Sequence, residues 1–336
     1  MGWVVQNLRK ALELQGTFMR KTFNSTSPDS SKGFIRVGTW GRRSGDPQNN
    51  WSFGLEEGHK LVKITIDHGD HVIHSLMFTS ESKGVLHNSD MFGGWVGGET
   101  VSEVIFDGDE EINGINGTIG SRDGFVIISS LSFKTNKRTH GPFGQATKTA
   151  FSIPWDKGSL VGFYGLAGCY IDSIGIYLKA NEEILRVGTW GKTIPGAPHN
   201  IWDLQLQKNQ HLKKITIDHG DNINSFIFTT QYRSLTQTSE KVGQKLREET
   251  ISEVIFDENE EINSINGTIA LSKGHCPGHR VITSISFVTN KKTHGPYGNI
   301  RGELFTVSFE DGSFAGLYGI AGAYIDSIGV YLKSVL

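Results

Sequence analysis

Cysteine and proline are both scarce in this chain. Two of its 336 residues are cysteine, Cys169 and Cys276, and eight are proline. Two cysteines are too few for the disulfide framework that holds small secreted domains together. We therefore expect the fold to depend on hydrophobic cores, and the length is sufficient for about two domains.

The chain also lacks an excess of charge and a long apolar run. Lys and Arg number 33 and Asp and Glu number 35, which gives a formal charge of −2. This balance provides no electrostatic reason to expect nucleic acid or an anionic membrane as a partner. The sequence contains no stretch of about 18 apolar residues, so we expect no membrane insertion.

Residues 1–32 are basic and rich in Ser and Thr toward their end. They predict a short amphipathic helix or a disordered, loosely docked extension. A basic, Ser-rich start is also weakly compatible with an organelle transit peptide. No uninterrupted apolar core follows a charged start, so we expect no secretory signal. With two unpaired cysteines, this favours a reducing compartment.

The rest of the sequence is a tandem duplication. The repeat period is about 150 residues, far longer than the 20–50 residues of a solenoid repeat, so it predicts two copies of a whole domain. We assign the first copy to residues 33–180 and the second to residues 183–336. The repeated blocks are RVGTWG (36–41 and 186–191), KITIDHGD (63–70 and 214–221), and GCYIDSIGIYLK with GAYIDSIGVYLK (168–179 and 322–333).

Apolar residues within each copy recur with a period of two. Val62, Ile64 and Ile66, for example, alternate with polar neighbours, which is typical of β-strands. Glycine is abundant, at 42 residues, and pairs such as Asn116-Gly117 and Asn266-Gly267 predict hairpin turns. Helical patterns are nearly absent after residue 32. Each copy is therefore predicted to be an all-β domain of about ten to twelve strands.

Two groups of polar residues suggest chemistry other than binding. Asp67–Asp70 and its repeat combine His with carboxylates, but a turn after a strand explains them without a metal. The acidic stretches 107–111 and 257–261 invite comparison with a glycosidase pair, but we expect them to be solvated turns. The sequence contains no nucleophile elbow and no phosphate-binding loop. We expect no enzyme activity, no cofactor and no metal.

Four blocks carry a family resemblance: V-G-x-W-G, I-x-I-D-H-G, T-H-G-P-(F/Y)-G and G-x-Y-I-D-S-I-G-(I/V)-Y-L. In this order and spacing, twice over, they resemble the jacalin-related lectins of plants, in the uncleaved mannose/glucose-binding branch. The resemblance implies two tandem β-prism (type I) domains. Each would have three four-stranded Greek-key sheets around a pseudo-threefold axis and would bind sugar at one end.

The resemblance also implies a function. It predicts an agglutinin with one site per domain that cross-links mannose- or glucose-containing oligosaccharides or glycoproteins. It further implies a homo-oligomer, expected to be a dimer, in the cytoplasm and also in the nucleus. The alternative is a protein-interaction or structural module whose sugar sites have degenerated.

The G-x-x-x-D loop supplies the chemistry that such a site needs. A carboxylate accepts hydrogen bonds from two hydroxyls at once, backbone amides donate, and glycine permits close approach. By resemblance, Asp172 and Asp326 hold the 4- and 6-hydroxyls of the sugar, and the amides of 169–170 and 323–324 bond the ring oxygen and 6-hydroxyl. Alternatively, each Asp caps a turn before a buried strand. The candidate carbohydrate-binding residues are Gly45, Gly168, Cys169, Tyr170, Asp172, Gly196, Gly322, Ala323, Tyr324 and Asp326.

The sequence departs from the family pattern at two places, and the differences between the loops of the two copies predict unequal sites. The position often occupied by Asp is Cys169 in one copy and Ala323 in the other, and both glycine-rich loops are irregular. Arg42, Arg43 and Lys192 in those loops either reach an acidic glycan or are solvated charges. A third loop, 121–124 in the first copy and 272–278 in the second, is expected to line the same end, and it differs in length between the copies.

Overall fold

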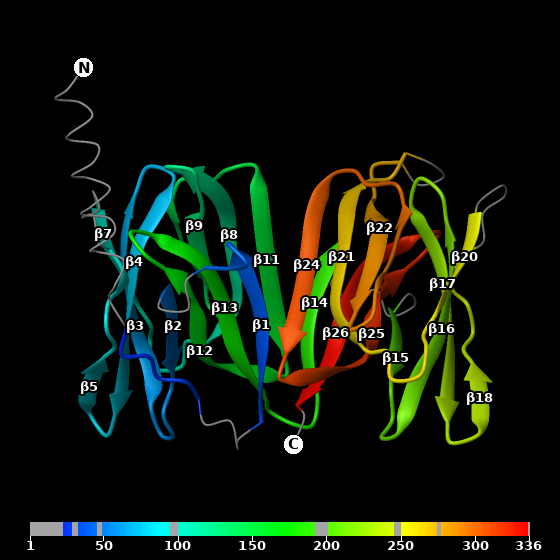
Figure 1. The fold of residues 1–336 in the computed structure, drawn as a ribbon, viewed down its shortest axis with the longest axis horizontal. Coiled ribbons are helices and arrows are strands. Elements are labelled where there is room, and N and C mark those ends of the chain that lie inside the picture. The colour runs from blue at the N-terminus through cyan, green and yellow to red at the C-terminus, as the bar shows by residue number, and fades with distance from the viewer. Residues whose placement is uncertain are drawn as a thin grey trace. The chain divides into compact units, whose positions relative to one another are not determined.

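The computed structural model describes residues 23–28, 33–45, 49–94, 100–191, 201–244, 250–273 and 277–334. These residues form 26 β-strands and no α-helix (Figure 1). The all-β prediction is confirmed. In the described part of the chain there is no helix long and apolar enough to cross a membrane.

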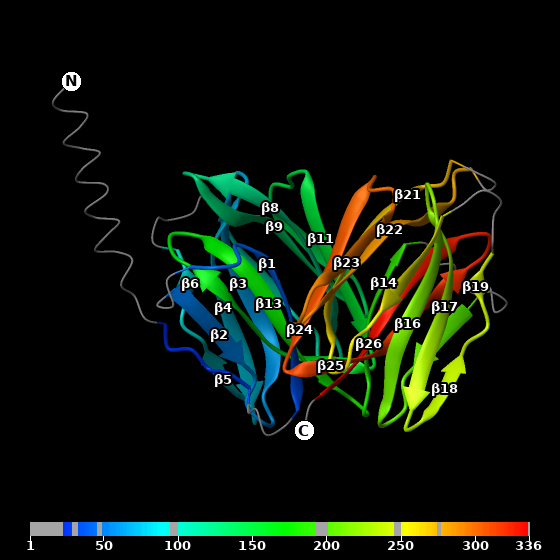
Figure 2. The same ribbon diagram turned by 45° about the vertical axis from the view of Figure 1, so that its right-hand side comes forward.

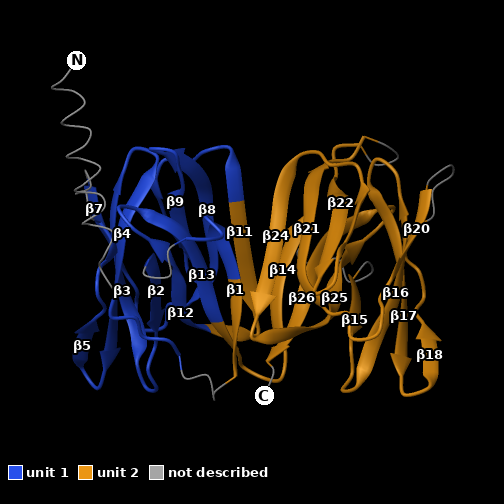
Figure 3. Ribbon diagram, in the orientation of Figure 1, with its two compact units in different colours: residues 1–32, 38–150, 160–177 blue, residues 33–37, 151–159, 178–336 orange. Residues whose placement is uncertain are grey.

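Two compact units make up the chain (Figure 3). The first contains residues 1–32, 38–150 and 160–177, and the second contains residues 33–37, 151–159 and 178–336. Within the second unit, Val37 pairs with Phe309, and Trp155 pairs with Val187. The repeat boundaries at 33–180 and 183–336 remain a prediction.

The first copy of the repeat contains thirteen strands in three antiparallel groups. Their pairing orders are β5-β4-β3-β7, β10-β9-β8-β11 and β2-β12-β13-β1, and the short β6 also pairs with β4. The strands are β1 (Phe34–Gly41), β2 (Asn50–Gly54), β3 (Lys60–Gly69), β4 (Val72–Ser82), β5 (Val85–Asn88), β6 (Phe92–Gly93), β7 (Thr100–Ile105), β8 (Ile112–Arg122), β9 (Phe125–Thr135), β10 (Thr139–Gly144), β11 (Thr149–Asp156), β12 (Gly158–Ala167) and β13 (Ile171–Ala180).

The second copy repeats this arrangement. Its orders are β18-β17-β16-β20 with β19 on β17, β23-β22-β21-β24 and β15-β25-β26-β14. The strands are β14 (Leu185–Gly191), β15 (Ile201–Gln205), β16 (Gln210–His219), β17 (Ile223–Tyr232), β18 (Leu235–Thr238), β19 (Val242–Gly243), β20 (Thr250–Ile255), β21 (Ile262–Leu271), β22 (Arg280–Thr289), β23 (Thr293–Gly298), β24 (Glu303–Glu310), β25 (Gly312–Ala321) and β26 (Ile325–Ser334).

Alternate residues of the strands fill the core of each unit. Ile64 and Ile66 are fully buried, and they pair in register with Phe78 and Leu76 of β4. A bulge after Leu61 shifts the alternation, so Leu61 is buried in place of the predicted Val62. The period of two is otherwise confirmed.

The predicted turns at Asn116-Gly117 and Asn266-Gly267 are wrong, because both pairs lie inside strands, β8 and β21. The second pair gives the physical reason. A Cβ atom at Gly267 would lie 2.5 Å from the Phe305 ring and 2.5 Å from the Ser284 carbonyl oxygen. Glycine is needed there because a neighbouring aromatic ring occupies its side-chain space, and not because the chain turns.

Two of the repeated motifs meet in space. Gly144, the last residue of THGPFG, donates its N–H to Nδ1 of His68 in the IDHG motif at 3.3 Å, and Nε2 of His68 lies 2.9 Å from the Ser102 hydroxyl. In the second unit, Gly298 donates to His219 at 3.1 Å. Burial lowers the pKa of both imidazoles, which favours the neutral ring that this acceptor role requires. These histidines therefore join two strands.

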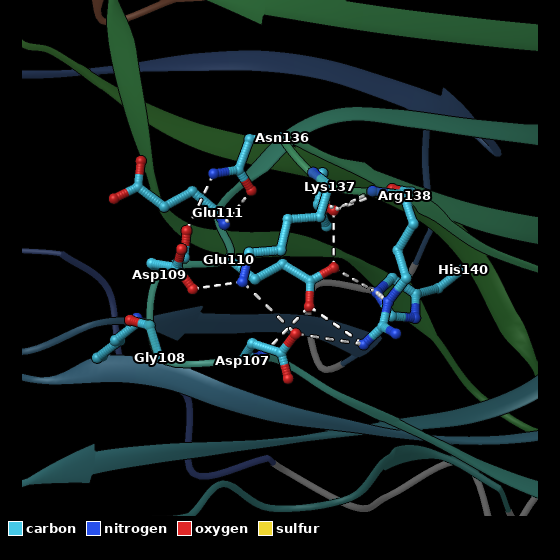
Figure 4. Close-up of polar contacts among 11 residues, drawn as sticks. Asp107, Gly108, Asp109, Glu110, Glu111, Asn136, Lys137, Arg138 and His140 are labelled. Atoms are coloured by element: carbon cyan, nitrogen blue, oxygen red, sulfur yellow. Dashed lines mark hydrogen bonds and ion pairs between the residues drawn. The ribbon is translucent and has the colours of Figure 1, made fainter.

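The acidic stretches are not wholly solvated, which corrects our expectation. The Glu110 side chain is completely buried, and it accepts hydrogen bonds from Thr135 Oγ1 at 2.7 Å and from His140 Nε2 at 2.8 Å (Figure 4). Burial raises the pKa of Glu110, but these bonds outweigh it and hold the pKa at about 2. Glu260 repeats the arrangement with Thr289 and His294. The acid stretch and the THGP motif are thus two sides of one structural cluster.

Residues 23–28 pack on the first unit, so this part of the extension is neither helical nor loosely docked. Thr26 donates its N–H to the Ser52 carbonyl of the edge strand β2 at 2.9 Å, and Ser52 Oγ returns a bond to the Thr26 carbonyl at 3.0 Å. Phe23 is buried and meets Phe92 edge to face at 5.6 Å. This segment covers the open edge of a sheet.

Candidate functional site

The turn between β12 and β13 carries the first candidate site. The N–H of Gly168 donates to the Tyr170 carbonyl at 2.9 Å, which closes the turn, and Asp172 follows as the second residue of β13. A Cβ atom at Gly168 would meet no atom within 4 Å. The turn therefore presents bare backbone to open space directly beside a carboxylate.

The glycine-rich loop is fixed to this turn through the backbone. Arg42 donates its N–H to the Asp172 carbonyl oxygen at 2.9 Å. Gly41 has a φ of 105°, and a Cβ atom there would lie 2.2 Å from that same oxygen. Only glycine fits at this approach. Gly191 repeats the geometry against the Asp326 carbonyl, also at 2.2 Å.

The Asp172 carboxylate is buried, with 9% of its side chain exposed. Arg42 Nη1 lies 3.4 Å from Asp172 Oδ2. Burial raises the pKa of Asp172 to about 6, and the Arg42 guanidinium opposes that rise. The site thus holds a carboxylate with few partners, which is suited to accept hydrogen bonds from a ligand.

Gly45 lies beside the Arg42 side chain. It is exposed, and a Cβ atom there would lie 3.4 Å from Leu166 and 3.7 Å from the Arg42 guanidinium carbon. That guanidinium also stands 5.8 Å from the centre of the Phe125 ring. The structure therefore brings Gly45 and the G-x-x-x-D loop together, and it places Arg42 at the carboxylate, while Arg43 is exposed.

The third loop meets the same end of the first unit (Figure 2). The Tyr170 hydroxyl donates to Asp123 Oδ2 at 3.0 Å, and Asp123 and Gly124 form the tight turn between β8 and β9 with positive φ angles of 52° and 83°. Cys169 is half-buried beside Tyr170, and burial raises the pKa of its thiol. The thiol of Cys169 is thus uncharged at this site.

The second unit repeats the backbone of this site. Gly322 donates its N–H to the Tyr324 carbonyl at 2.9 Å, and Tyr324 is buried as Tyr170 is. Asp326 is half-buried, whereas Asp172 is buried, and Ala323 is half-buried. The remaining predicted residues of this unit, Gly196, Lys192 and Cys276, lie outside the described residues.

One residue of the second unit was missed by the sequence analysis. Arg301 donates to the Leu271 carbonyl at 2.8 Å, to the Asn222 side chain at 2.6 Å and to the Asp221 carbonyl at 3.5 Å. In the first unit, Arg122 donates to the carbonyl of Asp70, the repeat partner of Asp221, at 3.1 Å. Arg122 and Arg301 are not equivalent in the repeat, so no alignment of the two copies would pair them.

The arrangement is suited to binding a polyhydroxylated ligand. The first unit combines a carboxylate, a backbone turn and a second loop bonded to it, and the second unit repeats the carboxylate, the turn and the close approach of Gly191. Among the residues that the structure describes, no three His, Cys, Asp or Glu side chains converge as metal ligands.

The jacalin-like lectin domain family matches residues 37–177 and 187–331, which is most of the chain. The chain belongs to this family. The matches include both G-x-x-x-D loops and both Trp-Gly blocks. With three groups of four paired strands in each copy, the β-prism fold that the resemblance implied is confirmed.

Known lectins are similar either to most of this chain or to about one half of it. The mannose/glucose-specific lectin of Parkia platycephala is 33% identical over 90% of the chain, which spans 66% of that protein. The agglutinin of Castanea crenata is 30% identical over 89% of the chain and 98% of that protein. Wild-type Malaysian banana lectin is 36% identical over 44% of the chain and 100% of that structure, with a TM-score of 0.39.

Proposed function

We propose that this jacalin-like protein is a non-enzymatic lectin that binds mannose- or glucose-type glycans, with one site in each unit. The observation that carries the proposal is the buried Asp172 carboxylate beside the bare Gly168 turn. The half-buried Asp326 occupies the equivalent position in the second unit. The names of the Parkia relatives support the choice of sugar.

The chemistry follows from the geometry of the turn. Neighbouring hydroxyls of a hexopyranose donate to the two oxygens of Asp172, and the amides of residues 169–170 donate to the ring oxygen and the 6-hydroxyl. Gly168 lets the ring approach the backbone, and Gly45 allows the same from the opposite loop. Asp326 and the amides of residues 323–324 do the same in the second unit, together with Gly196.

Each site alone is expected to be weak, on the order of millimolar, because a shallow polar site competes with water. Two sites per chain, and four in a homodimer, convert weak binding into avidity for branched glycans. We propose that the protein cross-links glycoproteins or oligosaccharides in the cytoplasm and nucleus.

The test is a calorimetric titration of methyl mannoside into the full chain. We expect heat from the wild type and none from an Asp172→Asn/Asp326→Asn double variant. A Glu111→Gln/Glu261→Gln double variant removes the same charge from exposed positions and should bind like the wild type. Silence from the wild type would favour a protein-interaction module, and release of reducing sugar from oligomannose would indicate a hydrolase.

A further inference from the structure

The first site holds an ion pair between Arg42 of the glycine-rich loop and Asp172. Arg42 follows Gly41 in the loop, and its side chain turns back onto Asp172, with Nη1 3.4 Å from Oδ2. The backbone hydrogen bond between the same two residues, at 2.9 Å, fixes the root of the arginine side chain. The fold of the loop therefore places the guanidinium of Arg42 beside the carboxylate of Asp172.

Asp172 needs such a partner because its surroundings oppose its charge. About nine-tenths of its side chain is out of contact with water, and burial disfavours the ionised form. An unionised carboxyl would offer one donor and fewer acceptor sites, whereas the sugar's hydroxyls need acceptors. The positive charge of Arg42 favours the ionised form.

The other titratable groups near Asp172 do not replace Arg42. Cys169, from the β12–β13 turn, has a thiol whose pKa is raised, so the thiol stays neutral. It therefore supplies no positive charge in place of Arg42. Asp123, from the β8–β9 turn, is negative and accepts the Tyr170 hydroxyl. Arg122 donates to the Asp70 carbonyl and stands 5.8 Å from the centre of the Tyr170 ring. His74 of β4 meets that ring edge to face, with the ring centres 5.4 Å apart.

We propose that Arg42 is a positioning residue of the first carbohydrate site, acting through Asp172 to keep its carboxylate ionised and able to accept sugar hydroxyls. This inference rests on the proposed function for its effect on binding. It predicts that binding at the first site has an acid limb that Arg42 sets. The limb lies near pH 6 with Arg42 present, because the pKa of Asp172 is about 6.

The binding experiment uses the full chain with the second site disabled by Asp326→Asn. Methyl mannoside is titrated at several pH values between 5 and 8. Removing Arg42 by Arg42→Ala is expected to move the acid limb upward by roughly half to one pH unit. Arg42→Lys keeps the positive charge, so its acid limb should lie close to that of the wild type. Arg43→Ala removes the same charge from the exposed neighbour and should leave the limb unchanged.

A second measurement does not depend on sugar. The Asp172 carboxyl is titrated by carbon NMR in the free protein and assigned with Asp172→Asn. A higher pKa of Asp172 in Arg42→Ala supports the proposal, even if no sugar binds. An absence of sugar binding would contradict the proposed function and not the role of Arg42. An unchanged pKa, or tighter mannoside binding by Arg42→Ala at every pH, would overturn the role of Arg42.

Discussion

Asp172 and Asp326 occupy the same position of the repeat, but their surroundings differ. The first is buried and paired with Arg42, whereas the second is half-buried. The backbone that carries them is the same, with Gly41 and Gly191 held against the aspartate carbonyls in both units. The comparison teaches that the duplication preserved the backbone of the site, while the burial of its carboxylate diverged.

The surroundings of the frame diverged as well. Arg122 donates to the β3–β4 turn in the first unit, and the non-equivalent Arg301 donates to the β16–β17 turn in the second. Residues 23–28 cover the edge strand β2 of the first unit. By contrast, Glu110 and Glu260 have the same threonine and histidine partners in both units. The buried carboxylate clusters are thus matched between the two units, whereas the turn-binding arginines and the segment on the edge strand are not.

The largest expected effect tests whether Glu110 and Glu260 stabilise their two units equally. Glu110→Ala and Glu260→Ala each leave a half-buried histidine and a buried threonine without their carboxylate, and each should cost about 3 kcal/mol in the free energy of unfolding. Urea unfolding followed by hydrogen exchange would localise each loss to one unit. The neighbouring exposed Glu111→Ala should cost little. Unequal losses would break the equivalence of the two frames.

Acid should act on both clusters alike. The pKa of Glu110 and that of Glu260 are both held at about 2, below the ordinary value of 4.5. The stability that these carboxylates contribute is therefore full above about pH 4.5 and is lost as the pH falls toward 2. Glu110→Gln should flatten this loss in the first unit only, as measured by unfolding across that range.

A smaller effect tests the contact of residues 23–28 with the edge strand β2, which belongs to the first unit. Phe23→Ala removes a buried ring from its contact with Phe92 and should cost about 2 kcal/mol, felt in the first unit. Phe23→Leu should recover part of this loss by refilling the volume. The check is hydrogen exchange of β2 against that of β15. Equal loosening of both strands would contradict the assignment of residues 23–28 to the first unit.

The smallest effect tests the two aspartates. The pKa of Asp172 in the folded chain, about 6, lies above the ordinary 3.8, so its ionisation costs stability that is regained as the pH falls from about 6 toward 3.8. Asp172→Asn should therefore stabilise the first unit at pH 7.5, by on the order of 1 kcal/mol, although it removes sugar binding. Asp326→Asn should stabilise the second unit less, because Asp326 is half-buried. Thermal unfolding at pH 7.5 and pH 4 measures both.

Much of the fold could be predicted from the sequence because it depends on period and repetition. The alternation at Ile64 and Ile66 was sufficient to recognise strands. The turn predicted at Asn266-Gly267 failed because the need for glycine comes from Phe305, on another strand. Local pattern does not reveal such contacts between distant residues.

The site was predictable in its backbone and less so in its charges. The order of the motifs pointed to Asp172, and the structure places Gly45 and the β8–β9 turn beside it. The pairing of Arg42 with Asp172 depends on how one loop folds back, which spacing alone does not determine. The role of Arg301 was hidden because Arg301 lies between β23 and β24, whereas its counterpart in function, Arg122, ends strand β8.

The most direct test is a crystal of the full chain soaked in concentrated methyl mannoside. If each unit grips a hexopyranose through one acidic side chain and a bare stretch of main chain, a sugar will appear with two hydroxyls on Asp172 and two on Asp326. Ordered solvent alone at both aspartates would contradict the account.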